Sequence, residues 1–213
     1  MPGQVPIPTE IIHMTHVDNL PIILQSGELR STVLLQGVAE HVTSIAYTSI
    51  QQQRAMKPVP CRAGGCLHDY VPFYFCRKSP MLYTISRGNV PCEGGQDALV
   101  HMVSTAQAVA QAGLPFVFSD GHGIMAYTEF FDDLDEMRAV DWNVIAARYW
   151  HDTPDDGDRK RRRQAEFLVR DRFPLNLLQE IVVRSAAARD HVEALLNQAN
   201  VAVPVTVNSA WYY

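Results

Sequence analysis

The sequence predicts an α+β fold, and three observations support this prediction. Segments rich in β-branched and aromatic residues are interspersed with segments of helical spacing, but they do not repeat as regular βαβ units. The 213 residues, of which 47% are hydrophobic and 19% are charged, suffice to bury one large core. No repeat, low-complexity tract or linker divides the chain. We therefore expect a single domain over residues 1–213.

The first elements are indicated by local turn and capping residues. Residues 11–16 begin with β-formers and then turn polar, which predicts a strand that ends in a functional loop. Asp18 can cap a short helix that ends before Gly27. After a stretch without sustained periodicity, Ser49 can cap a polar helix over residues 50–56.

The middle of the chain is predicted from composition and spacing. Residues 70–76 and 81–86 are aromatic and β-branched enough for two strands. Residues 96–112 carry apolar positions at helical spacing and are followed by Gly113, so we expect a helix there.

The second half alternates between strands and helices. Residues 114–119 predict a strand that leads into a glycine-rich turn around His122, and Asp141 can cap a helix that runs to Tyr149. Residues 164–170 predict a further strand by alternation. The last elements are expected to be a strand over 180–184, a helix over 186–200 and a strand over 203–207.

Charge and hydropathy exclude several classes of protein. The net charge of −5, from 18 basic and 23 acidic residues, argues against a general polyanion binder. The N-terminal residues 1–8 lack the basic and apolar regions of a signal peptide, and no apolar run reaches the roughly 18 residues of a membrane span. We therefore expect a soluble, cytoplasmic protein without a membrane partner.

The four cysteines do not predict a metal site. Cys61, Cys66, Cys76 and Cys92 lack the close CxxC pairing of zinc sites, although His68 lies nearby. A cytosolic protein also keeps its thiols reduced. We expect free thiols and no metal. The sequence contains no GxGxxG, P-loop, HExxH or GxSxG motif, so dinucleotide binding of the Rossmann type and the corresponding hydrolases lose support.

Gln164 and Glu166 are the first candidate site residues. In a strand they would project from the same face, while Ala165 and Phe167 face the other way. An amide and a carboxylate on one face can grip a single ligand, and the carboxylate can stabilise positive charge on a ribose. The alternative is the solvated polar face of an edge strand.

A run of five basic residues, 159–163, directly precedes this strand. Such a run is usually a solvated loop. Its position allows Lys160, Arg161 and Arg163 to hold a pyrophosphate or a nucleic-acid backbone beside Glu166.

Three further residues have polar side chains in suitable places. His13 lies where a strand turns polar and could bind a ribose hydroxyl, and His122 has a glycine on each side that leaves room for a ligand. Arg54 follows three glutamines and could equally be a solvated helix residue. A buried, hydrogen-bonded or turn histidine is an equally good interpretation of either histidine.

Several blocks together resemble one family. These blocks are residues 13–21, 70–75, 79–83, 118–122 and 159–166. With them, the chain is similar to the DarT family of bacterial DNA ADP-ribosyltransferase toxins, in particular to its thymidine-modifying branch, from about residue 11 to the C-terminus. The resemblance implies an ADP-ribosyltransferase-like fold, with a split, strongly twisted β-core surrounded by helices, and NAD+ as co-substrate.

The resemblance also implies roles for individual residues. The family's catalytic glutamate corresponds to Glu166 and its catalytic arginine to Arg54, while the loop on the substrate side corresponds to residues 120–165 and includes His122. The family's NAD+ contacts correspond to His13, Met14, Thr15, Ile22 and Arg30.

The implied reaction moves ADP-ribose from NAD+ to N3 of thymine in single-stranded DNA and releases nicotinamide. The basic run, Gln164, and aromatics such as Tyr74 and Tyr127 would hold the strand. Family reasoning makes Arg54 the base, but a guanidinium holds its protons tightly, so Arg54 could instead bind phosphate or a base oxygen. Guanine in DNA, RNA or protein are alternative acceptors, and a non-catalytic nucleic-acid-binding module is the alternative from another class.

The resemblance finally implies a partner and a biological role. DarT toxins are encoded with DarG antitoxins, whose macrodomain removes the ADP-ribose. We therefore expect a toxin of a toxin–antitoxin system, with single-stranded DNA as substrate and a DarG-like macrodomain antitoxin as partner.

Overall fold

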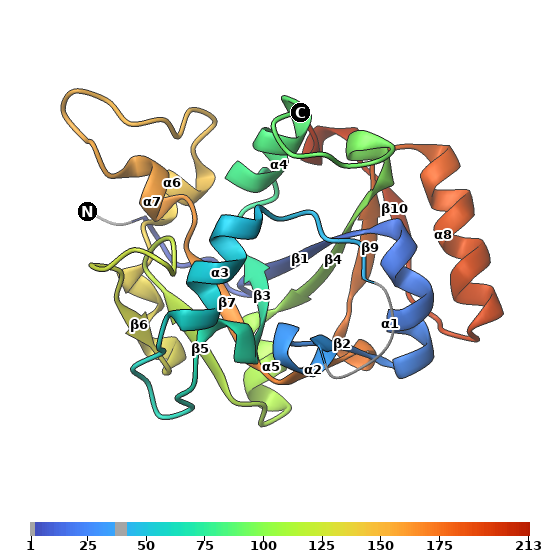
Figure 1. The fold of residues 1–213 in the computed structure, drawn as a ribbon, viewed down its shortest axis with the longest axis horizontal. Helices are drawn as coiled ribbons and strands as arrows, with labels where there is room; N and C mark the ends of the chain where they lie inside the picture. The colour runs from blue at the N-terminus through green and yellow to red at the C-terminus, as the bar shows by residue number, and fades with distance from the viewer. Residues whose placement is uncertain (1–2, 37–41) are drawn as a thin grey trace.

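The computed structural model describes residues 3–36 and 42–213 and contains one large mixed sheet (Figure 1). The strand order is β10-β9-β4-β1-β3-β7-β5-β6, and the neighbouring strands are antiparallel except for the parallel pair β9 and β10. The strands of this sheet are β1 (Glu10–His16), β3 (Tyr70–Tyr74), β4 (Leu99–Thr105), β5 (Phe116–Ser119), β6 (Phe130–Phe131), β7 (Glu166–Arg170), β9 (Glu180–Val183) and β10 (Val205–Val207). A small second sheet pairs β2 (Glu28–Arg30) with β8 (Arg172–Pro174).

The sheet is split at its centre. β1 pairs with β4 along its whole length, and β3 pairs with β7 over five residues. Between β1 and β3, however, the described residues form a single register pair, Ile12 with Tyr74. The two halves of the sheet therefore diverge from this point, as the resemblance to ADP-ribosyltransferases implies.

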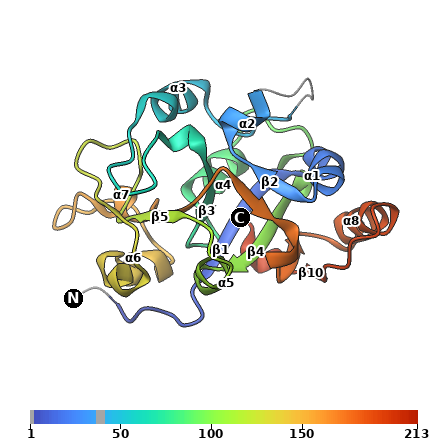
Figure 2. The ribbon, with the colours of Figure 1, turned by 90° about the horizontal axis from the view of Figure 1, so that it is seen from below.

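Helices cover both faces of the sheet. In Figure 2, α2 and α3 lie on one side of the central strands, while α5 and α6 lie on the other side. The helices are α1 (Leu20–Ser26), α2 (Thr32–Gln36), α3 (Thr48–Met56), α4 (Pro80–Ser86), α5 (Ala106–Gln111), α6 (Trp142–Ala146), α7 (Arg159–Arg162) and α8 (Ala186–Gln198). Successive side chains of a strand point to opposite faces of the sheet and therefore enter different hydrophobic clusters. Ile11 and Phe167 pack in the largest cluster, whereas Ile12 and Leu168 each pack in a different, smaller one.

Two predicted elements are wrong. Residues 81–86 form helix α4 rather than a strand, because Ser79 caps the backbone N–H of Leu82 and Pro80 occupies the first helical turn. Residues 99–105 form the central strand β4, every residue of which is buried, rather than the first part of a helix. A short apolar run fits a buried helix and a buried strand equally well, and the helix α5 begins only after Thr105.

Two predicted caps also differ, whereas most elements are confirmed. His16, not Asp18, caps the turn before α1, and α3 begins one residue before Ser49. Asp141 does cap α6 through the N–H of Val144, although α6 ends at Ala146. Across the described residues, no helix combines the length and the apolar character needed to cross a membrane.

Candidate active site

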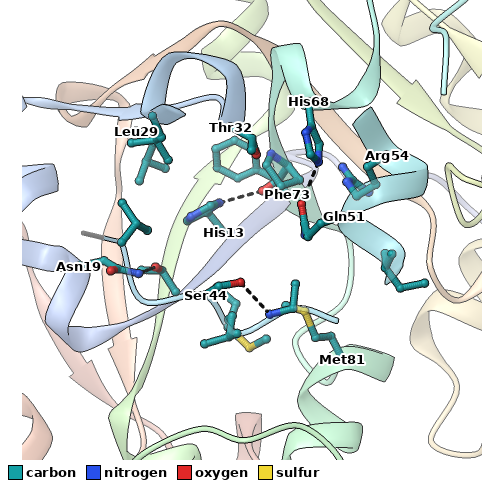
Figure 3. Close-up of a pocket in the computed structure, with 18 of the residues that line it drawn as sticks. His13, Asn19, Leu29, Thr32, Ser44, Gln51, Arg54, His68, Phe73 and Met81 are labelled. Atoms are coloured by element: carbon teal, nitrogen blue, oxygen red, sulfur yellow. Dashed lines mark hydrogen bonds between the residues drawn. The ribbon is translucent and has the colours of Figure 1, made fainter. Parts of the chain in front are cut away.

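A cavity of about 640 Å³ opens where the sheet splits. Its walls come from β1, β3 and β7 and from the helices α1 to α4, and its volume is typical of a site for a cofactor-sized ligand. Five lining residues are those expected to contact NAD+: His13, Met14, Thr15, Ile22 and Arg30. Figure 3 looks into the cavity, with Arg54 and His68 towards one end and Asn19 and Leu29 towards the other.

Arg54 and Glu166 form a buried ion pair at one end of this cavity. Arg54 Nη1 donates to both carboxylate oxygens, at 2.9 Å to Oε1 and 2.8 Å to Oε2. The two residues come from the last turns of α3 and the first position of β7, and they are only 8% and 5% exposed. The backbone N–H of Gly123 lies 3.4 Å from Oε1. The carboxylate is therefore fixed from two sides by hydrogen-bond donors before any ligand binds.

His122 lies on the other side of the same carboxylate. Its Nδ1 is 4.0 Å from Glu166 Oε1, and its backbone N–H donates to the carbonyl of Arg161 at 2.9 Å. Burial lowers the pKa of His122, helped by the nearby Arg54 guanidinium and opposed by Glu166. His122 is thus a neutral imidazole at pH 7, able to accept a proton.

Two polar atoms of this group lack a partner. Arg54 Nη2 and His122 Nδ1 are buried without a hydrogen bond to any of the described residues, although both side chains line the cavity. Buried polar atoms of this kind are costly unless a ligand or water satisfies them. The site therefore has one guanidinium donor and one imidazole nitrogen available to a polar ligand beside a carboxylate.

His13 bridges the split in the sheet. Its Nδ1 donates to the Pro72 carbonyl on β3 at 2.8 Å, which leaves Nε2 as the acceptor nitrogen of a neutral ring. Burial lowers the pKa of His13, and the ring rests edge-on against Phe73. Figure 3 shows this hydrogen bond in the floor of the cavity. The ring orientation is thus set before a ligand arrives.

Three further lining residues contribute in ways that the sequence did not indicate. His68 Nε2 donates to Gln51 Oε1 at 2.9 Å and so ties the segment before β3 to α3, the helix that carries Arg54. Tyr74, for which DNA contact stays a prediction, lies in the cavity wall at the register position opposite Glu166. The sequence named Tyr74 but gave no signal for the pairing of His68 with Gln51, which only the fold brings together.

The basic run does not form a free cationic edge. Carboxylates pair with Arg159, Lys160, Arg161 and Arg162, and the partners are Asp120, Asp141, Asp152, Asp156 and Asp158. Arg163 is buried, and its guanidinium donates to backbone carbonyls, including that of Val144 at 2.9 Å. Lys160 alone in this run keeps an exposed side chain, at 54%. DNA contacts by Lys160, Arg161 and Arg163 therefore stay a prediction.

Gln164 reaches the cavity by a different route from the one predicted. It lies in the turn after α7, before β7 begins, and its side chain donates to the Lys160 carbonyl. Gln164 and Glu166 nevertheless both line the cavity, while Ala165 and Phe167 are buried on the opposite side in the largest core cluster.

The four cysteines are free thiols, and in residues 3–36 and 42–213 no three potential metal ligands gather. Burial raises the pKa of Cys76, Cys61 and Cys92. These thiols are therefore less reactive than exposed ones.

Comparison with known proteins gives a consistent answer. The family model for DarT, described as ssDNA thymidine ADP-ribosyltransferase, matches residues 12–213. A relative from Thermus sp. (strain 2.9), named DNA ADP-ribosyl transferase, is 45% identical over 210 residues, which is 98% of each chain.

Solved structures agree with this family. Thermus sp. 2.9 DarT in complex with ADP-ribosylated ssDNA is 45% identical, with a TM-score of 0.93 over 100% of both chains. Thermus sp. 2.9 DarT in complex with NAD+ is 42% identical, with a TM-score of 0.88 over 99% of this chain and 100% of that one. Thermosipho africanus DarTG in complex with ADP-ribose is 19% identical, with a TM-score of 0.78 over 96% of this chain and 51% of that one, and supports the fold. The chain therefore belongs to the DarT family and is a DNA ADP-ribosyltransferase.

Proposed function

We propose that this enzyme transfers ADP-ribose from NAD+ to N3 of thymine in single-stranded DNA and releases nicotinamide. The observation that carries the proposal is the buried Arg54–Glu166 pair at one end of a large cavity, with Arg54 Nη2 still available to a ligand. Similarity to a relative that has been solved both with NAD+ and with ADP-ribosylated ssDNA supports the choice of substrates.

NAD+ is proposed to bind along the cavity, with its nicotinamide ribose beside Glu166. The cavity offers polar groups along its length, including the open Nε2 of His13, the Thr15 hydroxyl and the Arg30 guanidinium. Arg30 is partly engaged with Glu28 at 2.7 Å, so its remaining donors are the ones available to a phosphate or ribose.

The chemistry exchanges one C–N bond for another. NAD+ supplies an anomeric carbon whose bond to nicotinamide breaks, and the bonding electron pair leaves with the nicotinamide. Thymine N3 forms the new bond to that carbon and loses its proton. Glu166 accepts a hydrogen bond from a ribose hydroxyl and stabilises the positive charge that develops on the sugar. Its position is fixed by Arg54 and Gly123, so little reorganisation is needed.

Arg54 is proposed to act as a donor rather than as a base. Nη1 already donates to both Glu166 oxygens, and the free Nη2 can donate to a thymine carbonyl or to a ribose oxygen. A guanidinium in an ion pair retains its protons. His122, neutral and 4.0 Å from Glu166, is the proposed acceptor for the N3 proton.

The proposed requirement for single-stranded DNA follows from the position of the reacting atom in the base. Thymine N3 lies on the Watson–Crick edge, where it is paired in a duplex, so an enzyme that modifies it needs an unpaired base.

The test uses purified protein, NAD+ and two matched single-stranded oligonucleotides, one with a single thymine and one in which cytosine replaces it. Mass spectrometry is expected to find one added ADP-ribose on the first oligonucleotide only. Equal modification of both would contradict the thymine assignment, and modification of guanine, RNA or the protein itself would identify another acceptor. Binding without NAD+ consumption would indicate a non-catalytic module.

We further propose a toxin role in the cytoplasm, opposed by a macrodomain antitoxin of the DarG type. The proposal rests on family resemblance. Induced expression in bacteria is expected to stop growth, and Glu166→Gln is expected to abolish this effect at equal protein level. Co-expression of an active ADP-ribosyl-glycohydrolase macrodomain should restore growth, whereas a catalytically inactive macrodomain tests whether simple binding suffices.

A further inference from the structure

An apolar rim of three exposed side chains, Met56, Met125 and Tyr127, lies on segments next to the catalytic pair, and the geometry of Tyr127 gives its expected DNA contact a specific role. Met56, 84% exposed, is two residues after Arg54, and Met125 and Tyr127, 36% and 60% exposed, follow His122 in the chain. Lys57 Nζ donates to the Met125 carbonyl at 2.8 Å and joins the two segments. Exposed large apolar side chains that gather at the edge of an active site typically contact a ligand.

The ring of Tyr127 is positioned so that another ring can stack on it. The Arg161 guanidinium lies over the ring, 5.0 Å from its centroid, so one face is covered while the side chain as a whole stays exposed. Arg161 itself cannot swing away easily, because Asp120 and Asp158 hold it with hydrogen bonds of 2.8 to 3.1 Å. One face of the Tyr127 ring therefore lies against a fixed guanidinium, and the rest of the side chain is open to solvent.

The chemistry of this rim fits a nucleobase. Aromatic rings backed by a guanidinium bind unpaired bases by stacking, which requires no particular base sequence. The rim is also on the correct side of Glu166, since the segment that carries Tyr127 supplies Gly123, whose N–H lies 3.4 Å from the carboxylate. The cavity that is proposed to hold NAD+ is lined by His122 from this segment and also by His13 and Asn19, and Asn19 lies at the opposite end from Arg54 in Figure 3.

We propose that Tyr127 stacks on the base adjacent to the reactive thymine, with Met56 and Met125 as apolar contacts for the same stretch of single-stranded DNA. This inference rests on the proposed function. It assigns strand positioning to Tyr127, whose ring holds the neighbouring base so that the thymine reaches Glu166.

The test combines Tyr127→Ala with oligonucleotides that carry one thymine and a single abasic site at each flanking position in turn. For the unmodified enzyme, one abasic position adjacent to the thymine is expected to lower kcat/KM for DNA about tenfold. Tyr127→Ala is expected to lower kcat/KM for the intact oligonucleotide by a similar factor, with the KM for NAD+ unchanged. For this variant the same abasic position should cause no further loss.

Two variants serve as controls. Tyr127→Phe keeps the ring and should retain both the activity and its sensitivity to the abasic site. Tyr149 is a matched control, because it is 73% exposed and its ring lies 5.5 Å from the Arg148 guanidinium. Tyr149→Ala should leave the abasic profile unchanged. An abasic profile for Tyr127→Ala identical to that of the unmodified enzyme would overturn the inference. Absence of thymine modification by the unmodified enzyme would instead overturn the proposed function.

Discussion

At the scale of single residues, the site depends on the arrangement of a few polar groups around one carboxylate. Glu166 accepts hydrogen bonds from Arg54 and from the backbone of Gly123, and it lies within 4.0 Å of His122. All of these groups are largely buried, so their interactions are strong and poorly screened by salt. Small changes in charge or hydrogen-bonding capacity at this point should therefore alter catalysis strongly.

Glu166→Gln tests the charge of the carboxylate while it keeps the shape of the side chain. The variant is expected to lower the single-turnover rate of DNA modification by about 100- to 1000-fold, because the amide cannot balance positive charge on the ribose. Glu193→Gln, an exposed change on α8, is the matched control and should leave the rate unchanged. A Glu166→Gln rate within a few-fold of the unmodified enzyme would rule out the electrostatic role.

His122 predicts a specific pH dependence. Because burial lowers its pKa below the ordinary value of 6.5, the imidazole is neutral at pH 7 and becomes charged only in more acidic solution. As proton acceptor it must be neutral, so kcat is expected to be level near pH 7 and to fall only in solutions more acidic than the ordinary histidine pKa of 6.5. His122→Gln should be slower and should lose this acidic limb. Persistence of the limb in the variant would assign it to another group.

At the scale of elements, the glycine-rich turn after β5 is locked against α7. The His122 N–H donates to the Arg161 carbonyl, while the Arg161 side chain, 10% exposed, donates to Asp120. A side chain at Gly121 would meet Arg161 Nη1 at 2.4 Å, which explains why the turn needs glycine at this position. The basic run thus helps to place His122 and Gly123 relative to Glu166.

Arg161→Gln distinguishes this positioning role from contact with DNA. A glutamine has neither the positive charge nor the forked hydrogen bonds to two carboxylates, so the free energy of unfolding is expected to fall by about 2 kcal/mol and kcat to fall with it. The slope of log KM for DNA against log salt concentration should stay unchanged. Lys160→Ala is the comparison, because it removes an exposed ammonium. Loss of a phosphate contact by this group is expected to lower the slope by about 1 without loss of stability. A reduced slope in Arg161→Gln would show that Arg161 contacts the DNA backbone.

At the scale of the whole molecule, the split sheet creates the site. β1 and β3 diverge after one register pair, and His13 reaches across to the Pro72 carbonyl. β1 brings His13 and Thr15 to the cavity, and β7 brings Glu166, while the buried face of both strands packs in a continuous core. The opening therefore lies between two rigid halves, and its geometry depends on the stability of the sheet.

His101 links the stability of this sheet to pH. It is buried in β4, hydrogen-bonded to the Tyr212 hydroxyl at 2.9 Å, and burial lowers its pKa to about 3. The unfolded chain binds a proton below about pH 6.5, but the folded chain does not until about pH 3. As the pH drops from about 6.5 to about 3, the free energy of unfolding is therefore expected to fall by up to roughly 1.4 kcal/mol per pH unit.

Urea unfolding at several pH values checks this prediction. His101→Gln should be less stable at pH 7 but should show a shallower loss of stability towards acid. His191→Gln, an exposed change on α8, is the control and should keep the slope. Equal slopes in the unmodified protein and in His101→Gln would contradict a role for His101.

Much of the fold could be predicted from local patterns. Strands β1, β3, β5, β7 and β9 and helix α8 follow alternation, β-branched composition and capping residues, all of which act over a few residues. The errors at 81–86 and 99–105 arose where an apolar composition allowed both a helix and a strand. In one case the Ser79 cap decided the outcome, and in the other the position of β4 between β1 and β9 did so.

The sequence by itself determined which residue types were present and in what order, and hence the family, Glu166 and Arg54 as candidates, and five residues expected to contact NAD+. Only the tertiary structure decided which charges are free. The five basic residues before Glu166 suggest a DNA-binding edge, but aspartates 120, 141, 152, 156 and 158 neutralise most of it. Tyr127, which the sequence also named as a DNA contact, is exposed beside the fixed Arg161 guanidinium and is therefore the better candidate. The physical reason is that ion pairing and burial depend on distances across the fold, of which the order of residues along the chain gives no direct measure.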